Sequence, residues 1–282
     1  MRAKTATQCD GVCNFCRPGS GKLAPRLQDF AMKFRLKAFS LHLLGSATAL
    51  TLILGTLYFG WYRWPGWRLA DVTQVVTVLI GVDLVVGPLM TMVIANSNKS
   101  RRELTRDIGI IVAVQICALI YGSGSLWNGR PLYYAFSVNI LQMVQAYDID
   151  SHEWELGRQQ NADLAPHWYS TPRWIWAPLP DDPEESRRIL TGAISGADDV
   201  TSMPRYFKPW EQGLPSLRGQ LKKVDDVAYF SLGEKKRLKD RMQAAGLGAD
   251  QKDTMPLTGR GKPLLAVFDL ASLRIIGLFK AK

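Results

Sequence analysis

One acidic residue stands alone within a long apolar stretch of the chain. Asp83 is the only Asp, Glu, Lys or Arg in residues 72–98. A carboxyl group near the middle of a membrane-spanning helix costs ~2.5–3.5 kcal/mol, so such residues are functional-site candidates by default. Pro88, which follows Gly87, cannot donate a hydrogen bond to the Leu84 carbonyl, and this leaves an open acceptor beside the acid. Asp83, Gly87 and Pro88 are therefore the intramembrane functional candidates.

A structural role for Asp83 is supported about as well as a functional one. Its carboxyl group could form a hydrogen bond between helices, and the candidate partners are Gln115, His42 and Thr77. A proton or ion pathway is less favoured, because a relay usually needs several ionisable groups. Small residues nearby, such as Gly45 and Ala49, indicate close helix packing more simply than a function.

The N-terminal cysteines resemble an iron–sulfur motif. Cys9, Cys13 and Cys16 have the C-x3-C-x2-C spacing of radical S-adenosylmethionine enzymes, in which thiolates hold the irons of a cluster. That chemistry requires a soluble α/β barrel after the motif, whereas an apolar run follows here. Residues 19–22 resemble a phosphate loop but lack the first Gly and the final Ser or Thr of the full pattern. We therefore expect no cofactor and no metal site.

Two adjacent acids and the basic, aromatic segment after them are the candidates in the second half of the chain. Asp198 and Asp199 could bind a cation or share a proton, although paired acids in loops more often form turns. The segment that follows has residue types enriched at protein interfaces. The partner-binding candidates are Asp198, Asp199, Pro204, Arg205, Tyr206 and Trp210. A buried aromatic cluster under a proline-bent loop explains the segment equally well.

Catalysis has little support in the sequence. His152 and His167 are the only histidines after residue 129, and neither has a metal-ligand spacing such as H-x3-H. Ser151, His152 and Glu153 are adjacent along the chain, but adjacency does not bring their side chains together. We expect no catalytic residues and predict that the protein is not an enzyme.

Three long runs with almost no charge must position Asp83 and its neighbours. They cover residues 38–62, 72–95 and 108–128 of the 282-residue chain, and each reaches the ~20 residues that cross a hydrocarbon layer. Helices buried in a soluble core usually have ~10–14 residues and keep a polar face. The predicted fold class is therefore a membrane domain of three transmembrane helices, residues 32–129, followed by a small α+β domain, residues 130–282.

The distribution of Lys and Arg predicts the orientation of these spans. Residues 1–37 carry eight, the loop between the second and third spans carries four, and the loop between the first and second carries two. Because cytoplasmic flanks are enriched in Lys and Arg, we expect a cytoplasmic N-terminus and a periplasmic C-terminal domain. Aromatic residues agree, since four tryptophans fall at the predicted outer interface of the bilayer: Trp61, Trp64, Trp67 and Trp127.

The basic loop between the second and third spans is the cytoplasmic candidate site. Its charged residues are Lys99, Arg101, Arg102, Glu103, Arg106 and Asp107. Anchoring against anionic lipid is the favoured role, and docking of a cytoplasmic partner is the second. The formal net charge of +10 is thus mostly a topology signal, since residues 130–282 carry only +2 of it. Nucleic acid is not an expected partner.

The last part of the chain has the local signals of an α+β domain. Residues 132–147 are aromatic and β-branched, which predicts one long strand or a bent pair. A helix is expected over residues 182–195, where an Asp cap precedes Pro, and another begins at the capping box of residues 231–234. A final strand pair is expected within residues 264–279.

Three segments of the chain resemble one known family. They are Met32-Lys33-x-Arg35-Leu36-Lys37-Ala38-Phe39, Gly81-Val82-Asp83-Leu84-Val85-x-Gly87-Pro88-Leu89 and Lys99-Ser100-Arg101-Arg102-Glu103-Leu104-x-Arg106-Asp107. The chain is similar there to the type IV pilin accessory proteins (the TfpX/TfpZ type), and the similarity continues around residues 196–210 and 256–260. The resemblance starts at Met32. Residues 1–31 are therefore expected to be a disordered extension or to precede the natural start.

The resemblance implies a bacterial inner-membrane protein that supports pilin stability, pilus assembly or extension and retraction, and hence twitching motility. Its expected partners are the major type IV pilin, the inner-membrane pilus assembly platform and membrane lipid. The helices would hold the apolar pilin helix before its extraction, with Asp83 paired to a polar group of that helix. Two alternatives stay open: an enzyme that modifies pilin on the periplasmic face, and a transporter or signalling subunit that uses Asp83.

Overall fold

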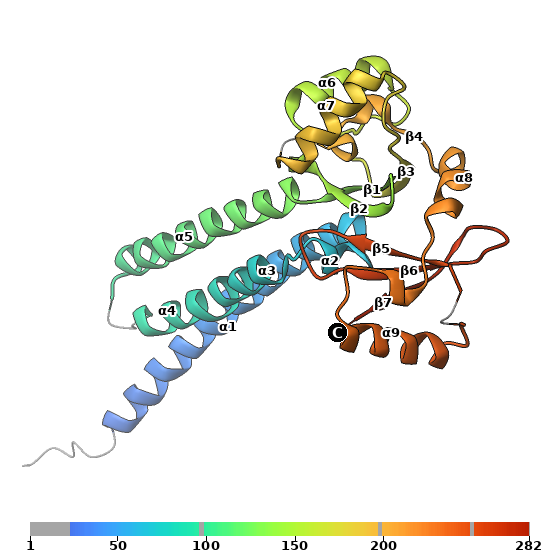
Figure 1. The fold of residues 1–282 in the computed structure, drawn as a ribbon. Coiled ribbons are helices and arrows are strands. Elements are labelled where there is room, and N and C mark those ends of the chain that lie inside the picture. The colour runs from blue at the N-terminus through green and yellow to red at the C-terminus, as the bar shows by residue number, and fades with distance from the viewer. Residues whose placement is uncertain (1–22, 96–98, 197–198, 249–250, 282) are drawn as a thin grey trace, which may run out of the picture.

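The computed structural model describes residues 23–95, 99–196, 199–248 and 251–281. Within these ranges, long helices extend from one side of a domain built on a mixed β-sheet (Figure 1). Of the predicted N-terminal extension, residues 1–22 lie outside the described residues, and so do its cysteines Cys9, Cys13 and Cys16. Residues 23–31 are helical and begin the first helix.

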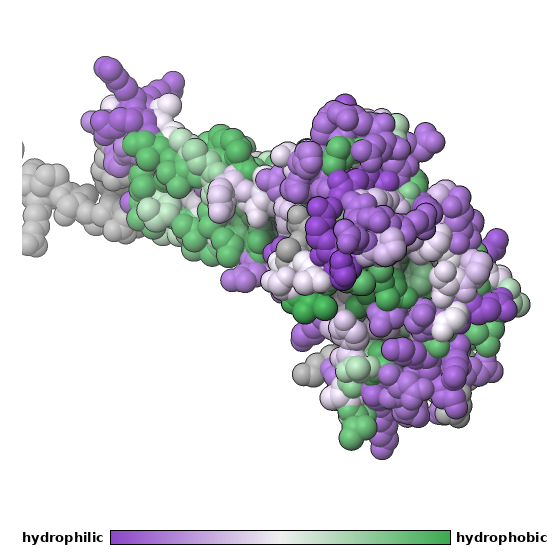
Figure 2. Space-filling view, turned by 45° about the horizontal axis from the view of Figure 1, so that its top comes forward, coloured by the Kyte–Doolittle hydropathy of each residue, from purple (hydrophilic) through white to green (hydrophobic). Residues whose placement is uncertain are grey.

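Three helical stretches of the described residues are long and apolar enough to cross a membrane. They are Met32–Tyr62, Thr73–Ile94 and Arg101–Asn128. The spans expected from the sequence overlap these stretches, and the third stretch begins earlier than residue 108. On the face that Figure 2 shows, hydrophobic residues cover the helices, and hydrophilic residues lie at the far end of the helices and over much of the sheet domain.

The helical region leaves one side of its bundle loosely packed. Its helices are α1 (Leu23–Leu57), α2 (Gly66–Leu69), α3 (Thr73–Ile80), α4 (Gly87–Ile94) and α5 (Arg101–Asn128). A π-helical turn, Tyr58–Tyr62, follows α1, and a π-helical segment, Gly81–Val86, joins α3 to α4. α4 packs against both α1 and α5, whereas α1 and α5 touch each other much less.

Among the described residues, the strands form one seven-stranded sheet in the order β4-β3-β1-β2-β5-β6-β7. They are β1 (Pro131–Ser137), β2 (Ile140–Gln145), β3 (Arg173–Trp176), β4 (Lys208–Pro209), β5 (Thr254–Thr258), β6 (Leu264–Phe268) and β7 (Ile275–Lys280). β1 is parallel to β3 and β2 is parallel to β5, whereas the other neighbours are antiparallel. The helices of this domain are α6 (Ser151–Gln160), α7 (Pro183–Ile194), α8 (Trp210–Gln220) and α9 (Leu232–Ala244).

Elements with strong local signals form where the sequence predicts them. The Asp182 carboxylate caps α7 by accepting a hydrogen bond from the Glu185 N–H, with an O···N distance of 2.9 Å. Ser231 and Glu234 form the capping box of α9. Residues 132–147 form the bent pair, an antiparallel hairpin of β1 and β2. The closing antiparallel pair, β6 and β7, is also confirmed.

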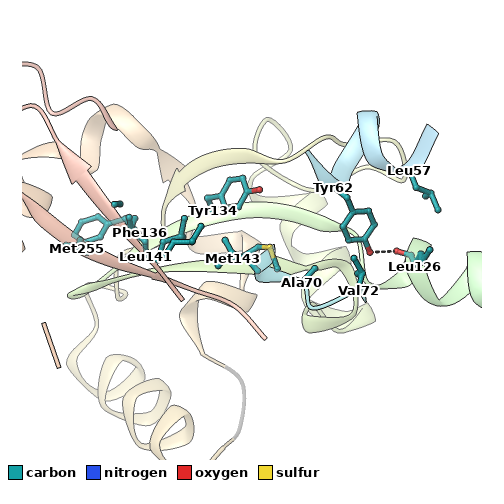
Figure 3. Close-up of a cluster of buried hydrophobic side chains, with 14 of the residues drawn as sticks. Leu57, Tyr62, Ala70, Val72, Leu126, Tyr134, Phe136, Leu141, Met143 and Met255 are labelled. Carbon is teal, nitrogen blue, oxygen red and sulfur yellow. Dashed lines mark hydrogen bonds between the residues drawn. The ribbon is translucent and has the colours of Figure 1, made fainter. Parts of the chain in front are cut away.

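The sheet domain and the ends of the long helices share one hydrophobic core (Figure 3). Because side chains alternate along a strand, Tyr134 and Phe136 of β1 face this core, whereas Tyr133 packs on the opposite face of the sheet. The Tyr62 hydroxyl donates a hydrogen bond to the Leu126 carbonyl of α5, with an O···O distance of 2.6 Å. The domain is therefore seated on the helix ends and fixes that end of the bundle.

Candidate functional site

A groove of about 400 Å³ between α1 and α5 contains the acid singled out from the sequence. Small residues of α1 form part of one wall: Gly45, Ser46 and Ala49. Apolar residues of α5 form the opposite wall, among them Val112 and Ile116. Its polar lining residues are His42, Ser46, Asp83, Thr91 and Gln115. The groove is thus an apolar cleft with polar groups at its base.

His42 connects two of these polar residues across the bundle. Its Nδ1 lies 2.5 Å from Thr91 Oγ1 of α4, and its Nε2 lies 2.6 Å from Gln115 Oε1 of α5. An amide oxygen only accepts hydrogen bonds, so His42 Nε2 is the donor to Gln115, whereas the Thr91 hydroxyl can either donate to or accept from Nδ1. Hydrogen bonds therefore join all three apolar stretches at this depth.

Gln115 extends the network to the π-helical segment. Its Nε2 lies 3.4 Å from the carbonyl oxygens of both Val82 and Asp83. The Gly87 N–H bonds to the Val82 carbonyl, five residues back, which is the π-helical pattern and is frequent at functional sites. A Cβ atom at Gly87 would overlap the Gln115 amide, so only glycine leaves the room that this amide occupies. Pro88 is buried next to it in the first turn of α4.

Gln115 contacts carbonyls beside the one that the sequence singles out. The sequence places the free acceptor at the Leu84 carbonyl because of Pro88, whereas Gln115 approaches the carbonyls one and two residues earlier. Thr77, the third partner considered for the acid, donates instead to the Thr73 carbonyl of its own helix, with an O···O distance of 2.8 Å.

Asp83 lies buried at the base of the groove. It is 3% exposed, and its Oδ2 atom has no hydrogen-bond partner among the described residues. A buried polar atom left in this state costs ~1–3 kcal/mol. The carboxyl group can accept a hydrogen bond when ionised and can donate one when protonated. Asp83 is thus a groove-lining acid with one carboxyl oxygen that has no hydrogen-bond partner among the described residues.

The predicted basic loop is largely the first turns of α5. A capping box of Ser100 and Glu103 starts this helix. Asp107 Oδ2 lies 2.8 Å from Lys99 Nζ, and Asp107 Oδ1 lies 3.4 Å from Arg106 Nη2. Acids close to a helix N-terminus interact favourably with the helix dipole. The other basic residues of this segment are exposed: Arg101 and Arg102.

The partner-binding candidates of the sheet domain are more enclosed than expected. Arg205 Nη1 lies 3.1 Å from Glu153 Oε1, and Arg205 Nη2 lies 3.9 Å from Glu185 Oε1. The Tyr206 hydroxyl donates to Glu185 Oε1 at 2.5 Å, and burial, followed by this hydrogen bond, raises the pKa of Tyr206. Pro204 is buried, and the Arg205 side chain is only 16% exposed. An open basic and aromatic patch is not formed here, because acids of α6 and α7 surround the guanidinium.

The remaining candidates of this domain have structural contacts. Trp210 packs edge to face against Trp174, with 5.4 Å between ring centroids. The Asp199 carbonyl accepts a hydrogen bond from the Ser202 N–H, with an O···N distance of 2.8 Å. Asp198 lies outside the described residues. Within the described ranges, no group of three or more His, Cys, Asp or Glu residues is placed to hold a metal ion. A partner-binding role for these residues stays a prediction.

The sequence predicts most of the polar residues at the base of the groove, but it does not predict that the groove is open between α1 and α5. Asp83, His42 and Gln115 were recognisable because each is a polar residue inside an apolar run. The sequence analysis did not select Thr91 as a site residue. Its position one helical turn after Gly87 is the feature that could have indicated it. Gly45 was expected to pack against another helix, whereas a Cβ atom there would meet no described atom within 4 Å.

Comparisons with known proteins relate the chain to fimbrial assembly proteins of Dichelobacter nodosus. It is 24% identical over 242 residues to the fimbrial assembly protein of serogroup I, which covers 84% of this chain and 91% of that protein. It is 22% identical over 241 residues to the serogroup E1 protein, which again covers 84% of this chain and 91% of that protein. It is 28% identical over 116 residues to the protein of serogroups C1 and C2. No family model and no solved structure matches the chain. At low identity but over most of its length, the chain is thus similar to proteins named for fimbrial assembly.

Proposed function

We propose that this protein is an inner-membrane accessory protein of type IV fimbriae, of the TfpX/TfpZ type, that supports pilin stability, pilus assembly, or extension and retraction. The similarity to fimbrial assembly proteins over most of the chain supports this process. Three long apolar helices support a membrane location. The groove above Asp83 is the observation that carries the proposal, because its small residues on α1 and its apolar wall on α5 would suit contact with an apolar helix of another protein.

The proposed occupant of the groove is the apolar helix of the major pilin. Gly45, Ser46 and Ala49 would let such a helix approach α1 closely, as small residues do between membrane helices. The apolar wall on α5 would lose its contact with lipid and gain packing contacts. Asp83 Oδ2, which has no partner within the described chain, would gain a hydrogen-bond donor from the pilin helix.

The proposed orientation has a cytoplasmic N-terminus and a periplasmic sheet domain. The excess of Lys and Arg in residues 1–37 and at the start of α5 supports it, since such flanks stay in the cytoplasm. The sheet domain, which is seated on the opposite helix ends, would then meet the pilin head or the assembly platform on the periplasmic side. In this proposal the protein acts by binding and not by catalysis.

Filling the groove tests the proposal. Gly45→Leu adds a side chain to open space, so the fold should persist while the groove becomes occupied. Gly55→Leu is the matched control, because this α1 glycine also has no described atom within 4 Å of a Cβ position and does not line the groove.

Each variant would be introduced into a strain that lacks the gene. We expect Gly45→Leu to weaken pilin binding by about tenfold, the effect of losing ~1.4 kcal/mol, and so to reduce the number of surface pili, whereas Gly55→Leu should restore them. The amounts of both variants in the membrane fraction should be equal. Normal piliation with Gly45→Leu would contradict the proposal.

A further inference from the structure

The loop between β5 and β6 docks onto the connection between α1 and α3. The Gly261 N–H donates to the Leu69 carbonyl of α2, with an N···O distance of 2.7 Å. A Cβ atom at Gly261 would overlap the Arg68 carbonyl oxygen, and one at Gly259 would lie 2.6 Å from the Leu69 carbonyl oxygen. The two glycines thus permit a backbone-to-backbone contact that a side chain would prevent. This contact holds the sheet domain against the helix ends.

Beside this contact, cations from three separate segments line one cavity of about 560 Å³. Arg68 comes from α2, Lys262 from the docked loop and Lys280 from the end of β7. Among the described residues that line the cavity, Asp71 is the single acid. The surplus of positive charge favours an anionic ligand.

The same cavity has aromatic walls. Tyr58, Trp64 and Trp67 line it, and Lys280 Nζ lies 4.6 Å from the centroid of the Trp64 ring. The rings of Tyr58 and Trp67 meet edge to face, with 6.1 Å between centroids. Trp and Tyr favour the depth of lipid headgroups, where one end of the ring contacts apolar groups and the other contacts water.

The position of the cavity along the helices matches that depth. Tyr58 lies near the end of the apolar stretch Met32–Tyr62, and Thr73, which also lines the cavity, begins the next stretch. Phe59 is 71% exposed, so an apolar surface continues beside the cavity along the helices. A ligand with an anionic head and an apolar tail matches both surfaces, whereas a free inorganic anion matches only one.

We propose that this cavity binds the headgroup of an anionic phospholipid from the leaflet next to the sheet domain. The phosphate contacts the cations of Arg68, Lys262 and Lys280, and the acyl chains follow the outer surface of α1 and α3. Since the cations come from both the helices and the sheet domain, the lipid stabilises the docked arrangement of the two. The inference does not depend on which partner enters the groove above Asp83.

Native mass spectrometry of the full chain in detergent tests this site. The protein is titrated with phosphatidylglycerol, and in separate arms with phosphatidylcholine and with glycerol 3-phosphate. The test variant is K262Q/K280Q, which changes two exposed lysines of the cavity. The control variant is K223Q/K236Q, which makes the same change of charge at two exposed lysines that do not line it.

We expect phosphatidylglycerol to bind at least ~10-fold more tightly than phosphatidylcholine. K262Q/K280Q should weaken the binding of phosphatidylglycerol by ~10-fold or more and leave the binding of phosphatidylcholine unchanged. The control variant should bind both lipids as the unchanged chain does. An unchanged affinity of K262Q/K280Q for phosphatidylglycerol, or an equal loss in the control, overturns the proposal. Binding of glycerol 3-phosphate as tight as that of the lipid overturns the lipid assignment in favour of a soluble phosphate ester.

Discussion

Gly87 and Gln115 act as a pair, since the missing side chain of one makes room for the amide of the other. Gly87→Ala would displace this amide from the carbonyls of Val82 and Asp83. We expect the variant to lose ~1–3 kcal/mol of folding stability, as other overpacked sites do. Thermal unfolding of the purified protein in detergent measures this loss. Gly81→Ala is the control, because a Cβ atom there meets no described atom within 4 Å, and equal melting temperatures for the two variants would contradict the pairing.

Asp253 gives the sheet domain a dependence of stability on pH. It is buried, and its Oδ1 atom has no hydrogen-bond partner within the described residues. Burial raises the pKa of its carboxyl group above the ordinary value. The folded state therefore binds the proton more tightly than the unfolded state, so the contribution of Asp253 is favourable at low pH and is lost as the pH rises through the folded pKa.

Asp253→Asn removes this ionisation from the buried site. We expect the variant to be more stable than the unchanged protein at pH 7, because burial disfavours the ionised carboxylate and the Asn amide does not ionise. Melting temperatures measured between pH 4 and pH 7 test this, because the advantage should shrink as the pH falls. An advantage of constant size across this range would show that the carboxyl group does not titrate as described.

At the residue scale, the sequence reveals which groups are unusual but not how they face one another. Asp83 stands out because a lone acid in an apolar run is costly wherever it lies. Its neighbours His42 and Gln115 were recognisable as polar residues in adjacent runs. The contact of His42 with Thr91 depends on the rotation of α4, which the π-helical segment before it sets. No local pattern encodes that rotation.

At the element scale, the sequence predicts what local signals specify. The caps of α7 and α9 and the hairpins of the sheet are encoded within a few residues, and they form where expected. β3 and β4 are short, and β3 pairs in parallel with β1 far away in the chain, so their formation depends on long-range contacts. β5 pairs in parallel with β2 as well as antiparallel with β6, so its place in the sheet depends in part on a long-range contact. These strands therefore could not be predicted from local patterns.

The docking of the β5–β6 loop gives a prediction at the same scale. Gly261→Ala would force the loop away from the Arg68 carbonyl and break the hydrogen bond to Leu69. We expect hydrogen exchange of residues 66–71 to become about tenfold faster, which corresponds to ~1.4 kcal/mol of lost stability. Gly233→Ala in α9, where a Cβ atom meets no described atom within 4 Å, should leave this exchange unchanged. Unchanged exchange in Gly261→Ala would contradict the docking role.

At the scale of the whole molecule, the sheet domain and the helices form one body because they share a core. Leu57, Tyr62 and Leu126 of the helical part lie in the same cluster as Phe136 and Met255 of the sheet (Figure 3). The two parts differ sharply in surface polarity, as Figure 2 shows. In the proposed function, the molecule would bind one partner at two levels: its apolar helix between α1 and α5, and its polar head beside the sheet domain.

If the protein binds pilin without modifying it, the covalent structure of pilin should not depend on this protein. If the protein only holds or guides pilin, the pilin from a strain that lacks this gene should have the same intact mass as pilin from the parent strain. The number of surface pili should fall, while the covalent structure of the pilin should not change. Intact-mass spectrometry of purified pilin measures this. A mass difference would favour the alternative of an enzyme that modifies pilin.

The most direct measurement is photo-crosslinking from the wall of the groove in native membranes. A photoreactive amino acid would replace Ile116, which lines the groove, or Val114, an exposed residue of the same helix that does not line it. The proposal predicts a covalent adduct with pilin from position 116 and little or none from position 114. Absence of a pilin adduct from position 116, in cells that assemble normal pili and contain normal amounts of the protein, would contradict the central claim.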